Sequence, residues 1–217
     1  MRHKLIVLPL ILALMAVSCT PQEEELPGAS GMPGPAFLAS LIGADGGNRL
    51  LGEGYTFAGY YDEPQHTVPG YVCQLADNWQ AVVLLEPARQ TVMCYDKQLA
   101  VEPYPYVEMA SRLKTYIAEE RSLLPDSAVT SFIGDIVDEP YDTTSTTRHF
   151  TSRAAFDAAV QAYLANADSV ASYPKIITMS TTGLAMSLSI EFARPMSKES
   201  DLKQTSITIT GNTGQTK

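Results

Sequence analysis

The chain has 217 residues, of which 24 are acidic and 15 are Lys or Arg, so its formal net charge at pH 7 is −9. Phosphate binding needs a clustered basic surface, and because the sequence shows no such cluster, nucleic acid is excluded as an expected partner. Hydrophobic residues make up 45% of the chain, and a chain of this length can bury a full core without help from a metal or a disulfide.

The first 18 residues predict a removable export signal. Arg2, His3 and Lys4 precede a run of thirteen apolar residues, Leu5–Val17, which is shorter than the roughly 20 residues that a membrane-spanning helix needs. Removal of this signal takes away two bases and no acid, which leaves 13 basic against 24 acidic side chains and a net charge of −11. The mature chain is therefore more acidic than the whole sequence.

Two short segments after the apolar run carry a family resemblance. Ala16–Cys19, with the sequence Ala-Val-Ser-Cys, resembles the lipobox at which bacterial lipoproteins are cleaved. This implies cleavage before Cys19 and attachment of acyl chains such as palmitate to that cysteine, which would anchor the protein in a lipid bilayer. Thr20–Glu25 resembles the acidic export tag of Bacteroidetes-type surface lipoproteins, which implies an outer-membrane protein exposed at the cell surface. A periplasm-facing orientation is the alternative.

The composition after the signal predicts the domain organisation. Residues 19–35 contain four prolines, three glycines and almost no apolar side chains, which is typical of a flexible tether. We therefore expect a signal at 1–18, a lipidated tether at 19–35, a single folded domain at 36–211 and a frayed tail at 212–217.

The first part of the expected domain, up to about Ala100, has the pattern of short strands separated by turns. An apolar strand is expected at Phe37–Ile42, followed by a turn at Asp45–Asn48, where Gly and Asn tolerate positive φ. Further strands are expected at Tyr55–Tyr61, Tyr71–Leu75, Gln80–Glu86 and Gln90–Tyr95. Proline at the second position of Glu86–Arg89 predicts the turn of a hairpin between the last two strands.

The middle of the chain changes to helical spacing. A first helix is expected around Met109–Ile117, because its apolar residues recur on one helical face. Another is expected at Ser152–Ala165, with Thr151 or Ser152 as its N-cap. The buried stripe of this helix should consist of Phe156, Val160, Tyr163 and Leu164.

The segment between these two helices is ambiguous. Apolar residues from Val129 to Val137 keep helical spacing, and Asp126 could be the N-cap of a helix there. Gly134 and the many β-branched residues favour a strand instead. A helix is the prediction, and the strand stays open as the alternative.

The C-terminal part returns to strands, at Lys175–Met179, Met186–Ala193 and Ser206–Thr210. Strict alternation of apolar and polar residues in the last two predicts an antiparallel sheet with one face on the core and one in water. The expected fold class is therefore α+β, a mainly antiparallel sheet with two or three helices packed on one face. A β-sandwich with a helical insertion is the alternative.

Cys73 and Cys94 remain once Cys19 is acylated, and an even number of cysteines in an oxidising compartment predicts a disulfide between them. In a flat three-strand meander their strands would lie about 10 Å apart, beyond disulfide reach. The disulfide therefore requires that the Tyr71–Leu75 strand is not the flat neighbour of the following hairpin. Two thiols that stay reduced are the alternative.

No catalytic or metal-binding motif stands out. His66 and His149 have no second His or Cys at ligand spacing, which argues against a zinc site of ordinary type. Ser111–Lys114 has the Ser-x-x-Lys spacing of penicillin-recognising enzymes, but the partner motifs of that family are missing. Neighbouring acids such as Glu119–Glu120 and Asp138–Glu139 fit solvated helix surfaces. No cofactor or metal is expected.

Aromatic residues are the one enrichment that points to a ligand, because exposed rings are a common platform for sugar rings and protein partners. Tyr55, Phe57, Tyr60 and Tyr61 cluster on one expected strand. The candidate binding residues are Tyr55, Tyr60, Tyr61, Trp79, Tyr104 and Tyr106. We therefore expect a membrane-anchored surface lipoprotein that is a non-enzymatic binding or assembly module for a glycan or a protein partner. The alternative is an extracytoplasmic hydrolase with an unrecognised, carboxylate-based site.

Overall fold

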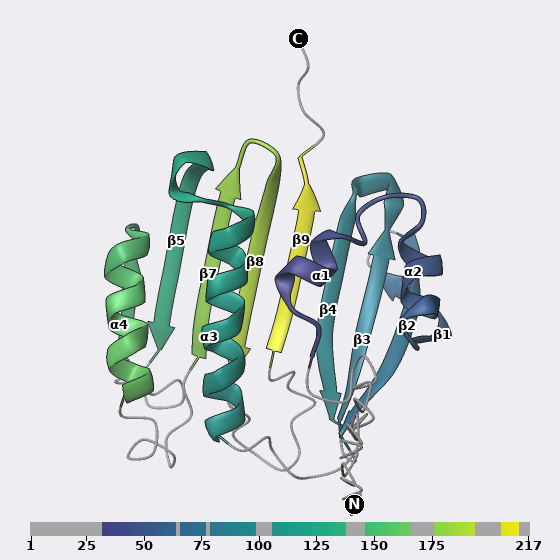
Figure 1. Ribbon diagram of the computed structural model, residues 1–217, viewed down its shortest axis with the longest axis horizontal. Helices are drawn as coiled ribbons and strands as arrows, with labels where there is room; N and C mark the ends of the chain where they lie inside the picture. Colours follow the sequence, from purple (N-terminus) through teal and green to yellow (C-terminus); the bar gives the residue numbers. More distant parts are fainter. Residues whose placement is uncertain are drawn as a thin grey trace, which may run out of the picture.

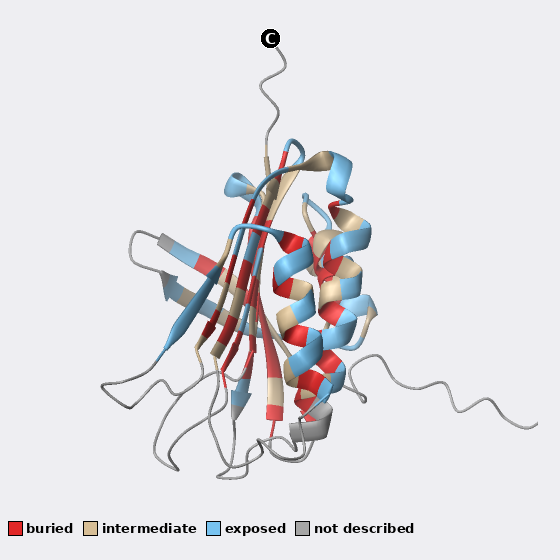
Figure 2. Ribbon diagram, turned by 90° about the vertical axis from the view of Figure 1, so that its left-hand side faces the viewer, coloured by how far each residue is buried: buried red, intermediate tan, exposed pale blue. Residues whose placement is uncertain are grey.

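The computed structural model describes residues 32–63, 66–76, 79–98, 106–137, 146–165, 176–193 and 205–212. In these ranges nine strands form one antiparallel sheet, in the order β1-β2-β3-β4-β9-β8-β7-β5-β6. Four helices lie on one face of this sheet (Figures 1 and 2). The expected α+β class is confirmed, and the β-sandwich alternative is wrong because the described strands belong to a single sheet.

The first half of the sheet is the meander that the sequence predicts. Its strands are β1 (Thr56–Glu63), β2 (His66–Ala76), β3 (Trp79–Glu86) and β4 (Thr91–Gln98). The expected turn between β3 and β4 is a short 3-10 helix, η1 (Pro87–Arg89), which ends at Gln90 with φ 51°. The hairpin prediction is therefore confirmed.

The two segments before β1 differ from the prediction. The expected strand at Phe37–Ile42 is largely helix α1 (Pro35–Ala39), and the expected turn at Asp45–Asn48 opens helix α2 (Gly46–Gly52). Proline in the first turn favours a helix start, and the Glu119 carboxylate accepts a hydrogen bond of 2.9 Å from the Ala36 backbone N–H. A short apolar run fits a buried helix as well as a strand, and here the buried helix forms.

The middle of the chain contains α3 (Tyr106–Leu123), the 3-10 turn η2 (Asp126–Ala128) and α4 (Arg153–Ala165). Helices α3 and α4 were both expected, and the Ser152 hydroxyl accepts a hydrogen bond of 3.5 Å from the Ala155 backbone N–H. The helix expected after Asp126 is wrong, because this segment is strand β5 (Val129–Val137). It pairs with β6 (Thr147–Phe150), which was not predicted.

Gly134 explains why the strand forms. A Cβ atom at this position would lie 2.4 Å from a ring carbon of Phe156, so the Phe156 ring of α4 packs directly on the backbone of β5. Phe156 is fully buried and makes edge contacts with Phe132 on β5 and Phe150 on β6, at ring-centre distances of 5.5 and 5.8 Å. A glycine that is unfavourable in a helix is thus the site where α4 docks on the sheet.

The last three strands complete the second half of the sheet. They are β7 (Ile176–Gly183), β8 (Met186–Ala193) and β9 (Thr205–Gly211). All three were expected, but their order was not. The final strand β9 does not lie at an edge; it pairs with β4 on one side and with β8 on the other.

The two faces of the sheet differ. The face under the helices is largely apolar, and Ile207, Ile209 and Ile190 on it are almost completely buried. The other face, which no helix covers in Figure 2, carries rows of Ser and Thr on β7, β8 and β9. At the β2–β4 end of this uncovered face, Val68, Val82 and Leu84 form a second, small apolar cluster.

The packed part of the chain begins earlier than the expected boundary at residue 36. Met32 is buried, and its backbone carbonyl accepts a hydrogen bond of 2.7 Å from the Tyr116 hydroxyl of α3. At the other end, the Asn212 backbone N–H donates to the Ala185 carbonyl at 2.8 Å. The expected signal, the rest of the expected tether and residues 213–217 lie outside the described residues. No helix of the described ranges is long and apolar enough to cross a membrane.

The expected disulfide between Cys73 and Cys94 is not formed. Cys73 on β2 pairs with Ala81 of β3, and Cys94 on β4 pairs with Val83 of the same strand, so β3 separates them. The requirement that Tyr71–Leu75 leave the meander is not met. Strands two places apart in a sheet are about 10 Å apart, which exceeds disulfide reach. Burial raises the pKa of both thiols, most strongly for Cys94.

Gly134→Ala should destabilise the protein by about 1–3 kcal/mol, because the new methyl group has to displace the buried Phe156 ring. The same substitution in a Phe156→Leu background should cost less. The matched control is Gly52→Ala, where no atom lies within 4 Å of the new Cβ. Urea denaturation measures the free energy of unfolding of each variant, and equal effects at Gly134 and Gly52 would contradict the packing described.

Candidate functional site

The structure separates the aromatic residues that the sequence groups together. Tyr55 and Trp79 are wrong as ligand-binding residues, because both lie in the main core and are only 5% and 3% exposed. Burial also raises the pKa of Tyr55 well above its usual value. Tyr104 lies outside the described residues, as does the side chain of Tyr106. Tyr60 is 70% exposed, whereas Tyr61 is partly buried against the small apolar cluster of the uncovered face.

Tyr60 instead belongs to an aromatic group that the sequence predicts only in part. The ring of Phe57 lies 5.5 Å from that of Tyr60 and 5.6 Å from that of Tyr71, both in edge-to-face geometry. Leu51 is 51% exposed and belongs to α2, the helix that packs beside β1. We call Leu51, Phe57, Tyr60 and Tyr71 the aromatic edge, since β1 is an edge strand of the sheet.

A β-bulge creates this group. Residues 57 and 60 would point to opposite faces of a regular strand, because side chains alternate with a period of two. In β1 the register shifts between Phe57 and Gly59, so that Phe57 pairs with Tyr71 and Tyr60 pairs with Pro69. Tyr71 and Pro69 are two residues apart on β2, so Phe57 and Tyr60 share a face. Gly59 has φ 105°, a conformation that glycine adopts without strain.

Helix α2 fixes the position of Tyr71. A Cβ atom at Gly47 would lie 2.3 Å from the Tyr71 hydroxyl oxygen, so the phenol rests against the backbone of α2. Tyr71 in turn supports the Phe57 ring, which is 45% exposed. The aromatic edge is therefore a surface built on two packed elements and not a set of isolated side chains.

The charges around the aromatic edge are mainly acidic. Asp62 is exposed two residues after Tyr60 on the same face of β1, and Glu53 follows the end of α2. Arg49 of α2 is the basic side chain of this region, and its guanidinium donates a hydrogen bond of 2.6 Å to the Ser40 carbonyl. A ligand that approaches the aromatic edge therefore meets exposed rings with carboxylates beside them.

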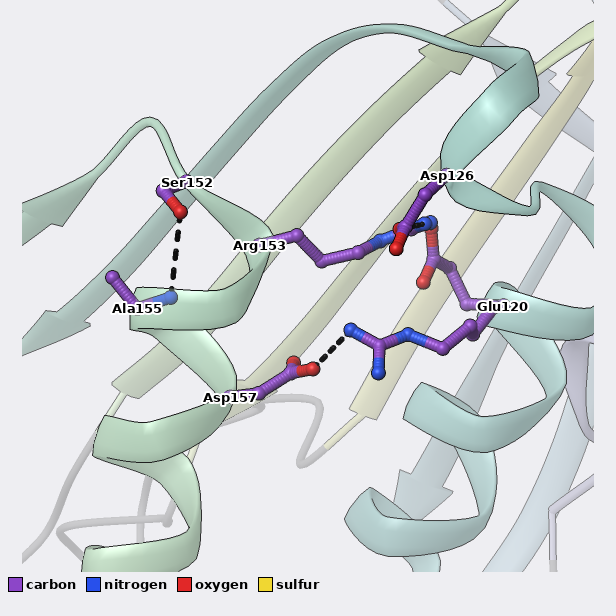
Figure 3. Close-up of polar contacts among 7 residues, drawn as sticks. Glu120, Asp126, Ser152, Arg153, Ala155 and Asp157 are labelled. Atoms are coloured by element: carbon purple, nitrogen blue, oxygen red, sulfur yellow. Dashed lines mark hydrogen bonds and ion pairs between the residues drawn. The ribbon is translucent and has the colours of Figure 1, made fainter.

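The hydrolase alternative requires a group of carboxylates, and such a group lies between α3 and α4. Figure 3 shows the Glu120 and Asp126 carboxylates at the end of the Arg153 side chain, which comes from the same helix as Asp157. Arg153 bonds to Glu120, which is only 1% exposed, and its second nitrogen donates to Asp126 at 2.7 Å. Arg121 bonds to Asp157.

This cluster has the properties of a clamp between helices. The hydrogen bond from Arg153 lowers the pKa of Asp126, while partial burial raises the pKa of Asp157 in spite of Arg121. A raised carboxylate pKa is a common mark of acid–base sites, but structural ion pairs produce it too. An arginine lies against each of the three carboxylates, so the arrangement favours attachment of α4 to α3 over proton transfer to a substrate.

The described histidine and acidic side chains provide no second candidate site. His149 on β6 lies 2.6 Å from the Asp135 carboxylate of β5, on a largely exposed part of the sheet. In the described part of the chain, no three His, Cys, Asp or Glu side chains come together as a metal site would require. The aromatic edge is therefore the candidate functional site.

Arg153→Met should destabilise the protein by about 3–5 kcal/mol, because it leaves the buried Glu120 carboxylate without its counter-charge. Arg121→Met is the matched control. Its ion pair with Asp157 is more exposed, so we expect a cost of about 1 kcal/mol or less. Urea denaturation compares the two, and a similar loss of unfolding free energy in both variants would refute the clamp.

No family model, curated protein or solved structure matches this chain. The assignment of a function therefore depends on the residues of the chain and on their geometry.

Proposed function

We propose that the protein is a surface lipoprotein of the outer membrane, anchored through acylated Cys19, and that it acts as a non-enzymatic binding module. The lipobox-like Ala16–Cys19 and the acidic Thr20–Glu25 support the location. The aromatic edge supports the binding role. Its ligand would be a glycan or a protein partner, since exposed rings bury much area against either at low entropic cost.

One observation carries this proposal. Five large apolar side chains are exposed in the described part of the chain, and three of them, Leu51, Phe57 and Tyr60, lie at the same end of the sheet. Single exposed apolar residues are normal on a protein surface, but grouped ones mark interaction sites. Ile133 and Leu184 are exposed elsewhere and provide controls.

The rings of the aromatic edge are held in place by neighbouring elements of the fold. The edge belongs to β1, at one end of the sheet, and its rings are held by contacts with β2 and α2. A rigid platform loses little side-chain freedom when a ligand binds, which favours affinity. Carboxylates with an adjacent arginine, in contrast, give the hydrolase alternative no support.

The test is photo-crosslinking on intact cells that carry the full chain. A photoreactive phenylalanine analogue in place of Tyr60 should give an adduct with the ligand, and the same analogue in place of Ile133 should not. Sensitivity of the adduct to protease or to glycosidase identifies its class. Phe57→Ser should lower the yield at position 60, because it removes the ring that contacts Tyr60.

Cys19→Ala controls for location. This variant should lose palmitate incorporation and leave the membrane fraction, and protease added to intact cells should digest only the anchored, unmutated protein. Equal adduct yields at positions 60 and 133 would refute the binding role of the aromatic edge. Protection of the anchored domain from external protease would refute its surface exposure.

A further inference from the structure

The backbone of β1 offers a second means of recognition beside its aromatic side chains. β1 ends the sheet, and on the side away from β2 no described strand pairs with it. In an antiparallel pair, every second residue of an edge strand directs its N–H and C=O groups away from its neighbour. At the opposite end of the sheet β6 has only four residues, whereas β1 has eight.

The bulge divides this edge into two parts. After the register shift, residues 59–63 pair regularly with β2 and form the longest uninterrupted stretch of the edge. Over this stretch Tyr60 and Asp62 lie on the face of the aromatic edge. The ring of Phe57, which precedes the bulge, contacts the ring of Tyr60. A strand that pairs with residues 59–63 would therefore place one side chain against Phe57 and Tyr60 and another beside Asp62.

We propose that β1 binds an extended segment of a partner protein by strand addition along residues 59–63. The partner segment carries an apolar residue opposite Tyr60 and a cationic residue opposite Asp62. This inference rests on the proposed binding role of the aromatic edge and names its partner class: a protein segment that is extended and basic.

Charge selects this partner over a second copy of the chain. Asp45, Glu53 and Asp62 outnumber Arg49 along α2 and β1, and the whole chain carries a net charge of −9. Pairing of two β1 edges would bring like charges together, which disfavours self-association. A lysine or arginine on the added strand would instead meet Asp62, and opposite charges directly across strands are favourable.

The test is a titration of the full-length mature protein with synthetic peptides, followed by fluorescence anisotropy. The probe is an eight-residue peptide of alternating Thr and Val in which two Val residues are replaced by Lys. One matched control has Glu in place of Lys. A second keeps every side chain but carries N-methyl groups on alternate backbone nitrogens, which blocks strand pairing alone.

We expect the Lys peptide to bind at least about fivefold more tightly than the Glu peptide and than the N-methylated peptide, because both cross-strand charge and backbone pairing contribute. Asp62→Asn should reduce the Lys preference, Tyr60→Ser should weaken binding, and Ile133→Ser should change neither. Hydrogen exchange should show new protection of amides within residues 59–63 in the complex. The exchange protection of strands away from β1, measured in each variant, reports whether that variant remains folded.

Three outcomes would overturn the inference. The Lys peptide could fail to bind, the N-methylated peptide could bind equally well, or β1 amides could become protected by self-association in the absence of peptide. Crosslinking of a glycan at position 60 together with any of these results would leave the proposed binding role intact and remove strand addition alone. Loss of both the crosslink and the peptide binding would refute the binding role of the aromatic edge as well as strand addition along β1.

Discussion

The position of β9 depends on Asp96, a carboxylate that is completely buried on β4. One of its oxygens accepts a hydrogen bond of 3.0 Å from the Thr205 backbone N–H at the start of β9, and the other lies 3.9 Å from the Arg112 guanidinium of α3. Asp96 thus joins the last strand, the meander and the longest helix. A buried charge is costly unless it is paired and hydrogen-bonded, so these contacts specify one arrangement of the three elements.

That arrangement places β9 between the two halves of the sheet. In the described residues β9 alone pairs with both halves, β1–β4 on one side and β5–β8 on the other. Its Ile207 and Ile209 side chains are fully buried under the helices. β9 and its neighbour β4 are far apart in sequence: the hydroxyls of Thr91 and Thr210 lie 3.1 Å apart, although their positions differ by 119 in the sequence. Such non-local pairing carries a large loop-closure cost during folding.

The uncovered face of the sheet and the aromatic edge differ in how far their side chains are engaged within the protein. On the uncovered face, Ser and Thr hydroxyls form hydrogen bonds with one another across neighbouring strands. The hydroxyls of Ser180 and Ser189, for example, lie 3.1 Å apart. Near β1 the Tyr61 ring lies across Gly70, where a Cβ would approach it within 2.2 Å, and helps to close the small apolar cluster. The aromatic edge has no comparable cover among the described residues, which is why we assign recognition to it.

Local patterns were enough to predict most strands and the two long helices. Alternation in β8 and β9 and the apolar stripe of α4 each follow from one short segment and its periodicity. The error at β5 has a local cause: Phe132 and Ile136 face α4 from a strand, while Ile133 between them is exposed, and this set also matches a helical stripe. Where two periodicities fit, the packing of Phe156 on Gly134 decides, and that contact is not visible in the sequence.

The candidate site was partly predictable for the same reason. Tyr60 was identified because it clusters with Phe57 and other aromatic residues on one strand. Tyr71 and the contact between the Phe57 and Tyr60 rings were not predicted, since a bulge changes which side chains share a face. Only the turn-forming Gly59 hints at the bulge from the sequence. The burial of Tyr55 and Trp79 and the separation of Cys73 from Cys94 depend on strand order, which periodicity does not determine.

The central claim is that β9 makes the two halves of the sheet one cooperative unit. Native-state hydrogen exchange of the intact protein at increasing urea concentrations tests it most directly, because it reports an opening free energy for each amide. We predict that the slowest amides of β4, β8 and β9 share one opening free energy, equal to that of global unfolding. A half formed by β1–β4 that opens independently of β5–β8, with its own free energy, would contradict the claim.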